Sequence, residues 1–359
     1  MSKICFVINS FDIGGIERVI VTLCNGLCKH HHVDLITLKN HGALKETLSC
    51  NVNIVDFCNI KARNLVKPLL LYLNKNKPDY IVTSIWPITV LSHIAIKKAK
   101  SDVKQIVTHH ALFDLENKKN IIADFCTKKI IAFFYNRAYK VLAVSVSVKR
   151  FLQNIGVKVV SVMYNPFDTE QRKLNVKKEL VNAVQYGKYF VFVGRLAKIK
   201  NITLILKSFS LFVSGDGYKD YNLLIIGDGS EKEFLKAYAE KLNIKQCCFF
   251  LGSKSFPEAY IQHAVAVLMA SFSEAMPVTV LESFGFNVPV VSTPATGCLD
   301  IFNLLGYSWH TDSFDNAEEY CSLMKYVVSH KDEFPDMASR VEENYGLEKI
   351  LDLWNEVLA

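Results

Sequence analysis

Two carboxylates eight positions apart, Glu274 and Glu282, lie in a stretch whose pattern places them on either side of the start of a helix. Pro277, between them, favours the first turn of a helix, where its missing N–H group leaves no hydrogen bond unmade. We therefore expect Glu274 in a loop and Glu282 within a helix that begins near Pro277. Free N–H groups at such a helix start bind phosphate, and flanking carboxylates suit hydroxyl groups. A nucleotide sugar has this order of groups: sugar, diphosphate, ribose. The alternative is that the two glutamates are solvated surface charges.

Cations and glycines follow other strands of the second half. The stretch 194–201 (GRLAKIKN) contains Arg195, which can bind phosphate with two parallel hydrogen bonds, and Lys200, which adds a point charge. Two further glycine turns follow strands, 227–229 (GDG) and 252–254 (GSK). Because the carboxyl ends of parallel strands meet at one edge of a sheet, these turns can converge with Glu274.

The first half has weaker signals of the same kind. Gly14-Gly15 stands between an expected strand and an expected helix, the arrangement that cradles phosphate in α/β folds, although an ordinary tight turn would look the same. Another strand, 104–110, ends in His109 and His110. Strand alternation points these two side chains in opposite directions, so at most one should serve the site. We favour His110, and the alternative is a structural histidine.

Strand-like and helix-like segments alternate along the whole chain. The expected strands are 4–9, 33–38, 52–57, 80–85, 104–110, 140–145 and 158–168, then 189–194, 222–227, 247–252, 264–270 and 290–293. This alternation predicts an α/β protein with two Rossmann-like, doubly wound domains that face a central cleft. We expect the domains at 1–168 and 188–345, a polar linker at 169–187, and a final helix near 346–359 that packs back on the first domain.

Composition limits the classes of protein. Half of the 359 residues are hydrophobic and 21% are charged, which is typical of a globular protein. The first residues read as a strand rather than a signal peptide, and no apolar run is long enough to span a membrane. The ten cysteines are scattered without CxxC pairs, as in a reduced cytoplasmic protein.

Charge is unevenly distributed. Residues 1–150 carry a net charge of +12 and residues 151–359 a net charge of −5, so we expect the first half to meet an anionic partner. Basic segments at 61–77, 97–104 and 117–140 interleave lysines with apolar residues. The last of these fits a helix on an anionic membrane surface, and a core-packed helix with a solvated basic face is the alternative. The residues of this helix pattern are Lys118, Lys119, Ile121, Ile122, Phe125, Lys128, Lys129, Ile130, Ile131, Phe133 and Phe134.

In their order and spacing, these motifs resemble those of the GT-B retaining glycosyltransferases of family 4, which build bacterial polysaccharides and lipid-linked oligosaccharides. The resemblance covers nearly the whole chain and is strongest in 188–300. It is carried by GGIERVIVTL, YNPFD, VGRLAKIKN, LLIIGDG, FFLGS and SEAMPVTVLESFGFNVPVVST with its E-x7-E spacing.

The resemblance implies a role for each matching residue. Arg195 and Lys200 would neutralise the leaving diphosphate, Glu274 would lie beside the transferred sugar, and Glu282 would accept hydrogen bonds from the ribose. His110 would contact the sugar or the acceptor. The remaining donor-binding positions are Gly14, Gly15, Gly194, Gly227, Ser253, Lys254, Met276, Val278 and Thr279.

The implied reaction is transfer of a hexose or N-acetylhexosamine from a nucleotide diphosphate sugar, most simply UDP-linked, to a hydroxyl of a lipid-linked glycan at the cytoplasmic face of the membrane. No Asp-x-Asp motif or metal-ligand spacing occurs in the sequence, so we expect neither a metal nor another cofactor. The segment 296–300 (TGCLD) departs from the GG-x-x-E of the family, which leaves the role of Asp300 open. A sugar-nucleotide epimerase and a non-catalytic nucleotide-sugar or nucleic-acid binding protein are the alternatives.

Overall fold

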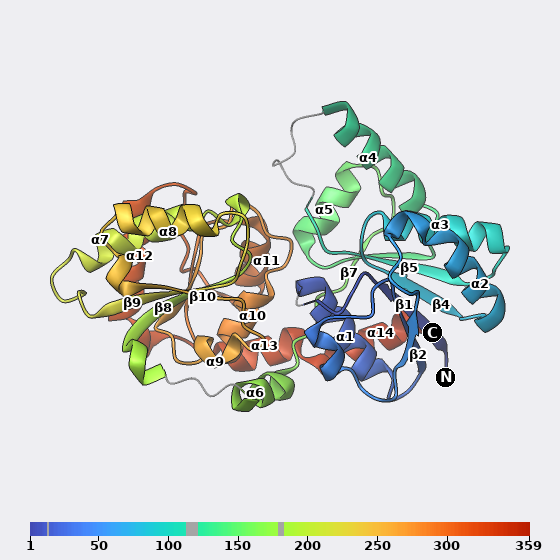
Figure 1. Cartoon of the computed structure of the whole chain (residues 1–359), viewed down its shortest axis with the longest axis horizontal. Helices are drawn as coiled ribbons and strands as arrows, with labels where there is room; N and C mark the ends of the chain where they lie inside the picture. Colours follow the sequence, from blue (N-terminus) through green and yellow to red (C-terminus); the bar gives the residue numbers. More distant parts are fainter. Residues whose placement is uncertain (13, 113–120, 179–182) are drawn as a thin grey trace. The chain divides into compact units, whose positions relative to one another are not determined.

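The computed structural model describes residues 1–12, 14–112, 121–178 and 183–359, which form two compact units (Figure 1). Unit 1 comprises Met1–Pro166 together with Leu347–Ala359, and unit 2 comprises Phe167–Gly346. The chain therefore passes between the units twice, and residues Phe167 and Gly346 at the two crossings form a β-bridge.

Unit 1 is built on a seven-stranded parallel sheet with strand order β3-β2-β1-β4-β5-β6-β7. Its strands are β1 (Lys3–Ile8), β2 (His32–Thr37), β3 (Asn53–Asp56), β4 (Tyr80–Thr83), β5 (Lys104–His109), β6 (Lys140–Ala143) and β7 (Ser161–Val162). Its helices are α1 (Gly15–Leu27), α2 (Val66–Asn76), α3 (Ile88–Ala99), α4 (Ile121–Tyr135), α5 (Val146–Asn154) and α14 (Leu347–Leu358), with short 3-10 turns η1 (Ala43–Thr47) and η2 (Ala62–Asn64).

The central strand β1 shows why this sheet needs helices on both faces. Its side chains alternate between the faces, as in any strand. Phe6 packs against Trp354 of α14, with ring centroids 6.2 Å apart, whereas Cys5 and Val7 belong to the core beneath α2 and α3. An apolar run such as KICFVI is therefore buried on both sides. Gly26 of α1 lets that helix approach α14, because a Cβ there would lie 2.6 Å from Leu351.

Unit 2 has a five-stranded parallel sheet with strand order β10-β9-β8-β11-β12. Its strands are β8 (Lys188–Val193), β9 (Tyr221–Ile226), β10 (Cys248–Gly252), β11 (Ala266–Met269) and β12 (Val290–Ser292). Its helices are α6 (Thr169–Lys178), α7 (Ile202–Val213), α8 (Lys232–Lys241), α9 (Glu258–Ile261), α10 (Val278–Gly285), α11 (Thr296–Leu305), α12 (Ala317–Ser329) and α13 (Met337–Tyr345). Short 3-10 turns occur at η4 (Ala183–Tyr186), η5 (Lys198–Lys200), η6 (Lys245–Cys247) and η7 (Lys331–Glu333).

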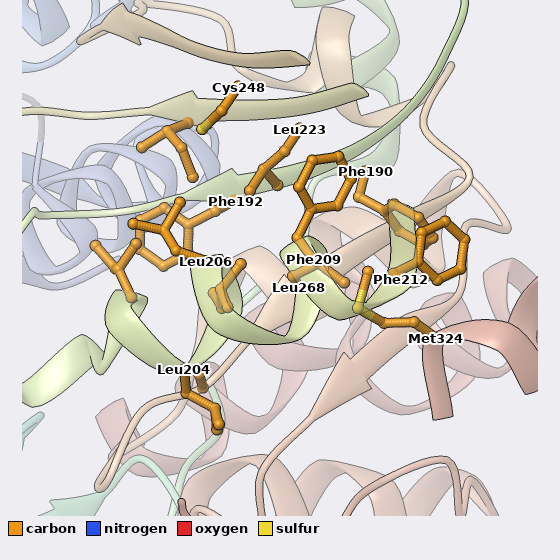
Figure 2. Close-up of a cluster of buried hydrophobic side chains, with 14 of the residues drawn as sticks. Phe190, Phe192, Leu204, Leu206, Phe209, Phe212, Leu223, Cys248, Leu268 and Met324 are labelled. Atoms are coloured by element: carbon orange, nitrogen blue, oxygen red, sulfur yellow. The ribbon is translucent and has the colours of Figure 1, made fainter. Parts of the chain in front are cut away.

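One core of unit 2 lies between the sheet and helices α7, α8 and α12 (Figure 1). Figure 2 shows Phe209 and Phe212 of α7 reaching Phe190 of β8, with Met324 of α12 beside them. The rings of Phe190 and Phe212 meet edge to face at 5.1 Å, a favoured geometry for aromatic pairs.

The expected α/β architecture is confirmed, and its doubly wound strand order has a consequence for the site. In each sheet the order reverses once, between β1 and β4 in unit 1 and between β8 and β11 in unit 2. Ligands of open parallel sheets bind beyond the carboxyl ends of the strands at such a reversal. The turns after β8 and β11 are therefore the first place to look in unit 2.

Two expected segments differ in the structure. The strand expected over 158–168 is reduced to the two residues of β7. The segment 169–187, expected as a linker, contains α6, which packs on α9 within unit 2.

The helix expected near 346–359 is α14, which packs on α1.

Candidate functional site

The turns that follow β8, β9 and β10 are hydrogen-bonded to one another. The N–H of Gly194 donates to the carbonyl of Ile226 at 2.9 Å, and the N–H of Gly227 donates to the carbonyl of Gly252 at 2.9 Å. Gly227 has a φ of +141°, and a Cβ there would lie 1.9 Å from the Gly194 carbonyl oxygen. Only glycine fits this approach, so the convergence expected of these turns is a property of their backbones.

Lys200 and Glu274 meet at the point where the strand order reverses. The Lys200 ammonium donates to the Glu274 carboxylate at 2.5 Å, and the Ser271 hydroxyl donates to the same oxygen at 2.7 Å. The side chains of Lys200 and Glu274 are 22% and 12% exposed, which leaves both within reach of a ligand. The N–H of Phe272 donates to the carbonyl of Ile199, so the turn after β11 is tied to the turn after β8.

The first turn of α11 supports the Glu274 loop from behind. A Cβ on Gly297 would lie 2.3 Å from the Glu274 carbonyl oxygen, so the two backbones are in direct contact. Asp300, whose role the sequence leaves open, lies in this helix and is partly buried.

Helix α10 begins where the sequence predicts, with Pro277 as its N-cap and Val278 and Thr279 in its first turn. The first N–H groups of a helix have no partner within it, so this end can bind an anion. Met276 is buried beneath the turn, whereas Val278 and Thr279 are partly exposed.

Other expected donor-binding side chains are arranged less tightly. Arg195 is exposed in the turn after β8, as is its neighbour Lys198. Ser253 is exposed in the turn after β10, and the Lys254 ammonium lies over the ring of Tyr260 at 5.6 Å from its centroid.

Glu282 has a partner that sequence reasoning missed. Its carboxylate is 2.8 Å from the guanidinium of Arg172, which also forms an ion pair with Glu258. Arg172 comes from α6, the segment expected to be a linker, and no local pattern in the sequence indicates this pairing.

In unit 1 the two histidines at the end of β5, His109 as its last residue and His110 directly after it, have different surroundings. His109 is buried, stacks on Phe151 at 6.1 Å, and its Nδ1 is 3.0 Å from the hydroxyl of Tyr135. Burial lowers the pKa of His109 to about 4. This residue is held within the fold.

His110 lies on the other side of the strand, partly exposed, with Nε2 3.0 Å from the Thr108 hydroxyl. It lines a small cavity with Ser84, Asn165 and Trp354. Burial and, to a smaller extent, the neighbouring His109 lower the pKa of His110 to about 3, so this imidazole is neutral at pH 7 and offers a hydrogen bond rather than a charge.

Gly14 and Gly15 form the start of α1, as expected. Gly14 is the N-cap, and a Cβ there would lie 2.2 Å from a carboxylate oxygen of Glu17, the end of a flexible side chain. A Cβ on Gly15 would have no atom within 4 Å, so open space lies beside this backbone.

Among the residues that the structure describes, no group of three or more His, Cys, Asp or Glu side chains is placed to hold a metal ion. Within the same residues, no helix is both long enough and apolar enough to cross a bilayer.

Comparison with known proteins decides the family. A model described as Glycosyltransferase Family 4 matches residues 13–171, and a model described as Glycosyl transferases group 1 matches residues 176–345. The chain belongs to glycosyltransferase family 4.

Similar proteins of this family act on lipid-linked and lipopolysaccharide glycans. The N-acetylgalactosamine-N,N'-diacetylbacillosaminyl-diphospho-undecaprenol 4-alpha-N-acetylgalactosaminyltransferase of Campylobacter jejuni is 24% identical over 84% of both chains. The lipopolysaccharide 1,6-galactosyltransferase of Escherichia coli K12 is 26% identical over 68% of this chain and 64% of its own. Among solved structures, Anabaena Alr3699/HepE in complex with UDP-glucose superposes with a TM-score of 0.83 at 16% identity, over 100% of this chain and 99% of its own. The fold of this family 4 enzyme is GT-B.

Proposed function

We propose that this glycosyltransferase moves a hexose or N-acetylhexosamine from a UDP-sugar to a hydroxyl of a lipid-linked glycan, with retention of configuration and without a metal. The observation that carries the proposal is the contact between Lys200 and Glu274 at the reversal of strand order in unit 2. The names of the relatives support the acceptor class, because they act on undecaprenol-linked and lipopolysaccharide glycans.

The chemistry follows from charge. When the bond between the sugar C1 and the diphosphate breaks, negative charge develops on the departing phosphate oxygen. Lys200 and Arg195, with the N–H groups at the start of α10, can stabilise that charge where a metal otherwise would. The acceptor oxygen forms the new bond to C1 on the same face, and its proton passes to the departing phosphate. Glu274 positions the sugar and holds Lys200.

The donor assignment is tested by thermal shift and by hydrolysis assays of UDP-, GDP- and ADP-sugars with EDTA present. A ligand at a hundred times its Kd stabilises a protein by about 2.7 kcal/mol. We expect one UDP-sugar to stabilise the protein and to be hydrolysed slowly, and Arg195→Ala to lose both effects. The matched control is Lys198→Ala, which removes another exposed cation of the same turn.

Three results would contradict the proposal. Activity that disappears with EDTA would contradict the metal-free mechanism. Interconversion of two UDP-sugars without transfer would indicate an epimerase. No response to any nucleotide sugar, with tight and salt-sensitive binding of RNA, would indicate a nucleic-acid binding protein.

The proposed partner of unit 1 is the anionic cytoplasmic surface of the membrane. Three large apolar side chains of α4 are exposed, Phe125 (59%), Phe133 (52%) and Ile130 (41%). Lys129 lies over the ring of Phe125 at 5.3 Å, and Arg137 lies over the ring of Phe133 at 3.5 Å. Apolar and basic groups on one helix face suit the boundary between head groups and acyl chains.

Helix α4 has features of both alternatives for this segment, a helix on a membrane surface and a helix packed on the core with a solvated basic face. Its opposite face packs into unit 1 through Ile131, Ala132 and Tyr135, so the exposed face is what remains for a partner. Of the residues in the expected pattern, Lys118 and Lys119 lie outside the described residues.

Vesicle flotation tests this partner. We expect the Phe125→Ser and Phe133→Ser double variant to bind vesicles with 30% anionic lipid at least tenfold less tightly, because about 0.8 kcal/mol is lost for each buried CH₂ group. Phe234→Ser, which removes an exposed phenylalanine of α8 in unit 2 (54% exposed), is the matched control. Equal binding by the α4 variant and this control would remove the membrane from the proposal.

A further inference from the structure

Three charged side chains are buried together in unit 2, away from bulk solvent. Arg172 of α6 is 8% exposed, Glu258 at the start of α9 is 0% exposed, and Glu282 of α10 is 4% exposed. We call these three residues the Arg172 cluster. A guanidinium nitrogen contacts Glu258, the same nitrogen lies 2.8 Å from an oxygen of Glu282, and Asn175 donates to Glu258 at 3.3 Å.

Stability alone does not explain such a cluster. Burying charges costs several kcal/mol per ion, and well-packed apolar residues in the place of a buried ion pair are often as stabilising or more so. The cluster also contains two carboxylates for one guanidinium, which leaves one negative charge in excess. A function for at least one of the carboxylates would account for this arrangement.

Glu282 is the member of the cluster connected to the candidate site. It lies in the second turn of α10, whose first turn is the expected anion-binding end, and it is the second carboxylate of the E-x7-E pattern. A buried carboxylate without a nearby cation tends to take up a proton. Arg172 places a guanidinium nitrogen 2.8 Å from one oxygen of Glu282, and a cation at this distance favours the ionised carboxylate. An ionised carboxylate is an acceptor through both of its oxygens.

Arginine suits this task better than lysine would. Its planar guanidinium presents several N–H donors in a fixed geometry, so one side chain can contact two carboxylates at once. Because Glu258 is fully buried and also contacts Asn175, it is a fixed second partner for the guanidinium nitrogen that contacts Glu282. The orientation of Glu282 is thus set by α6 and α9, two elements outside its own helix.

We propose that Arg172 is a positioning residue for the donor, which keeps Glu282 ionised and oriented to accept hydrogen bonds from the ribose hydroxyls of a nucleoside diphosphate. This inference rests on the proposed function, since it requires a nucleotide at the site. Arg172 would touch no substrate atom itself. Its removal should therefore affect recognition of the ribose diol and not recognition of the diphosphate.

Titration calorimetry with UDP and with 2′,3′-dideoxy-UDP separates these two effects. The wild-type protein should bind UDP at least about tenfold more tightly than the dideoxy analogue, because hydrogen bonds to a charged group are lost. Arg172→Met should remove most of this preference while its affinity for the dideoxy analogue stays within about threefold of wild type. Asn175→Ala, which removes the contact to Glu258 and a hydrogen bond from Gln171 but keeps Arg172, is the matched control and should keep the preference.

Each other outcome has a definite meaning. If Arg172→Met bound UDP and the dideoxy analogue more weakly by the same factor, the role of Arg172 would be merely structural and the inference would be overturned. An unchanged preference of this variant for UDP over the analogue would also overturn it. Equal binding of the two ligands by the wild-type protein would overturn it while leaving the donor site intact. Binding of neither ligand by the wild-type protein would overturn the proposed function, and the inference with it.

A second variant keeps the test decisive if Arg172→Met does not fold. Arg172→Met combined with Glu258→Gln restores the net charge of the cluster to its original value of one negative charge and leaves Glu282 without its cation. This double variant should show the same loss of ribose preference, and retention of the full preference would overturn the proposal.

Discussion

The two units present their strand ends differently, although both are doubly wound parallel sheets. In unit 2, backbone hydrogen bonds join the turns after β8, β9 and β10, and the side chains of Lys200 and Glu274 close the turns after β8 and β11. In unit 1, His110 is hydrogen-bonded to Thr108, two residues before it in the chain, and Gly15 has open space beside it. The turns at the strand ends of unit 2 are thus joined to one another, whereas the groups at the strand ends of unit 1 lie separately.

This difference bears on what each unit can recognise. A framework of backbone contacts places charged groups before a ligand arrives, which is what stabilisation of a developing charge requires. Separate groups lining a cavity can position a ligand by shape and single hydrogen bonds. We therefore expect substitutions in unit 2 to affect the chemical step most, and those in unit 1 to have smaller effects.

The largest effect should come from removing the Lys200 ammonium, which contacts Glu274 in unit 2. We expect Lys200→Met to lower kcat by about 10²–10³-fold, the range seen when one donor to a developing negative charge is removed. Initial rates at saturating donor measure this. Lys198→Met, an exposed lysine two residues away, should stay within about twofold, and an equal loss in both variants would mean that Lys200 contributes only general charge.

A smaller effect should follow from forcing the α11 backbone away from Glu274. A Cβ at position 297 would lie 2.3 Å from the Glu274 carbonyl oxygen, and the neighbour is backbone that cannot turn aside. Gly297→Ala should lower the free energy of unfolding by about 1–3 kcal/mol, the usual cost of overpacking, and should weaken UDP binding as well. Urea unfolding measures the free energy of unfolding, and calorimetry measures the affinity for UDP. An unchanged affinity for UDP would show that the Glu274 loop is not rigidly supported.

Acid should destabilise unit 1 through its two strand-end histidines. Their folded-state pKa values, about 4 for His109 and about 3 for His110, lie below the ordinary value of 6.5, with burial as the main cause. Stability from keeping them neutral is thus fully present above pH 6.5 and is lost as the pH falls toward 4. Each histidine should contribute a slope of roughly 1.4 kcal/mol per pH unit in this window.

The comparison for this prediction is His109→Phe, which keeps an aromatic ring against Phe151. Urea unfolding of both proteins between pH 4.5 and 7, followed by tryptophan fluorescence, should show a shallower pH dependence for the variant. Identical slopes would mean that His109 is no less basic in the folded state than in the unfolded state.

The smallest effect on stability is expected at Gly15, where the substitution should stabilise the protein rather than destabilise it. Alanine fits the first position of α1 without contact, so Gly15→Ala should raise the free energy of unfolding by about 0.4–1 kcal/mol. If the Gly15 backbone approaches the donor diphosphate, turnover should fall despite this gain. A more stable variant with full turnover would remove Gly15 from the site.

The sequence predicts the features of this protein that depend on local pattern. Apolar runs such as residues 189–194 indicate buried parallel strands, and glycines such as Gly227 mark turns where a Cβ would collide with a neighbouring backbone. The spacing of Glu274, Pro277 and Glu282 was sufficient to place one carboxylate before α10 and the other within it.

Contacts between distant segments could not be predicted in the same way. The helix α6 is polar enough to resemble a linker, because its exposed side chains include charged residues and its buried side includes Arg172 and Asn175. A buried arginine looks no different in sequence from an exposed one. Its pairing with Glu282, 110 positions later, emerges only when α6, α9 and α10 are packed together.

Because unit 1 is built from the two ends of the chain, it cannot be completed until synthesis on the ribosome reaches α14. Trp354 of α14 covers Phe6 of the first strand, yet the whole of unit 2 is synthesised between them. At roughly 5–20 residues per second, that interval lasts roughly ten to forty seconds. The unit that emerges first is thus finished last, and during this interval its uncovered apolar face is the surface that a chaperone would need to shield.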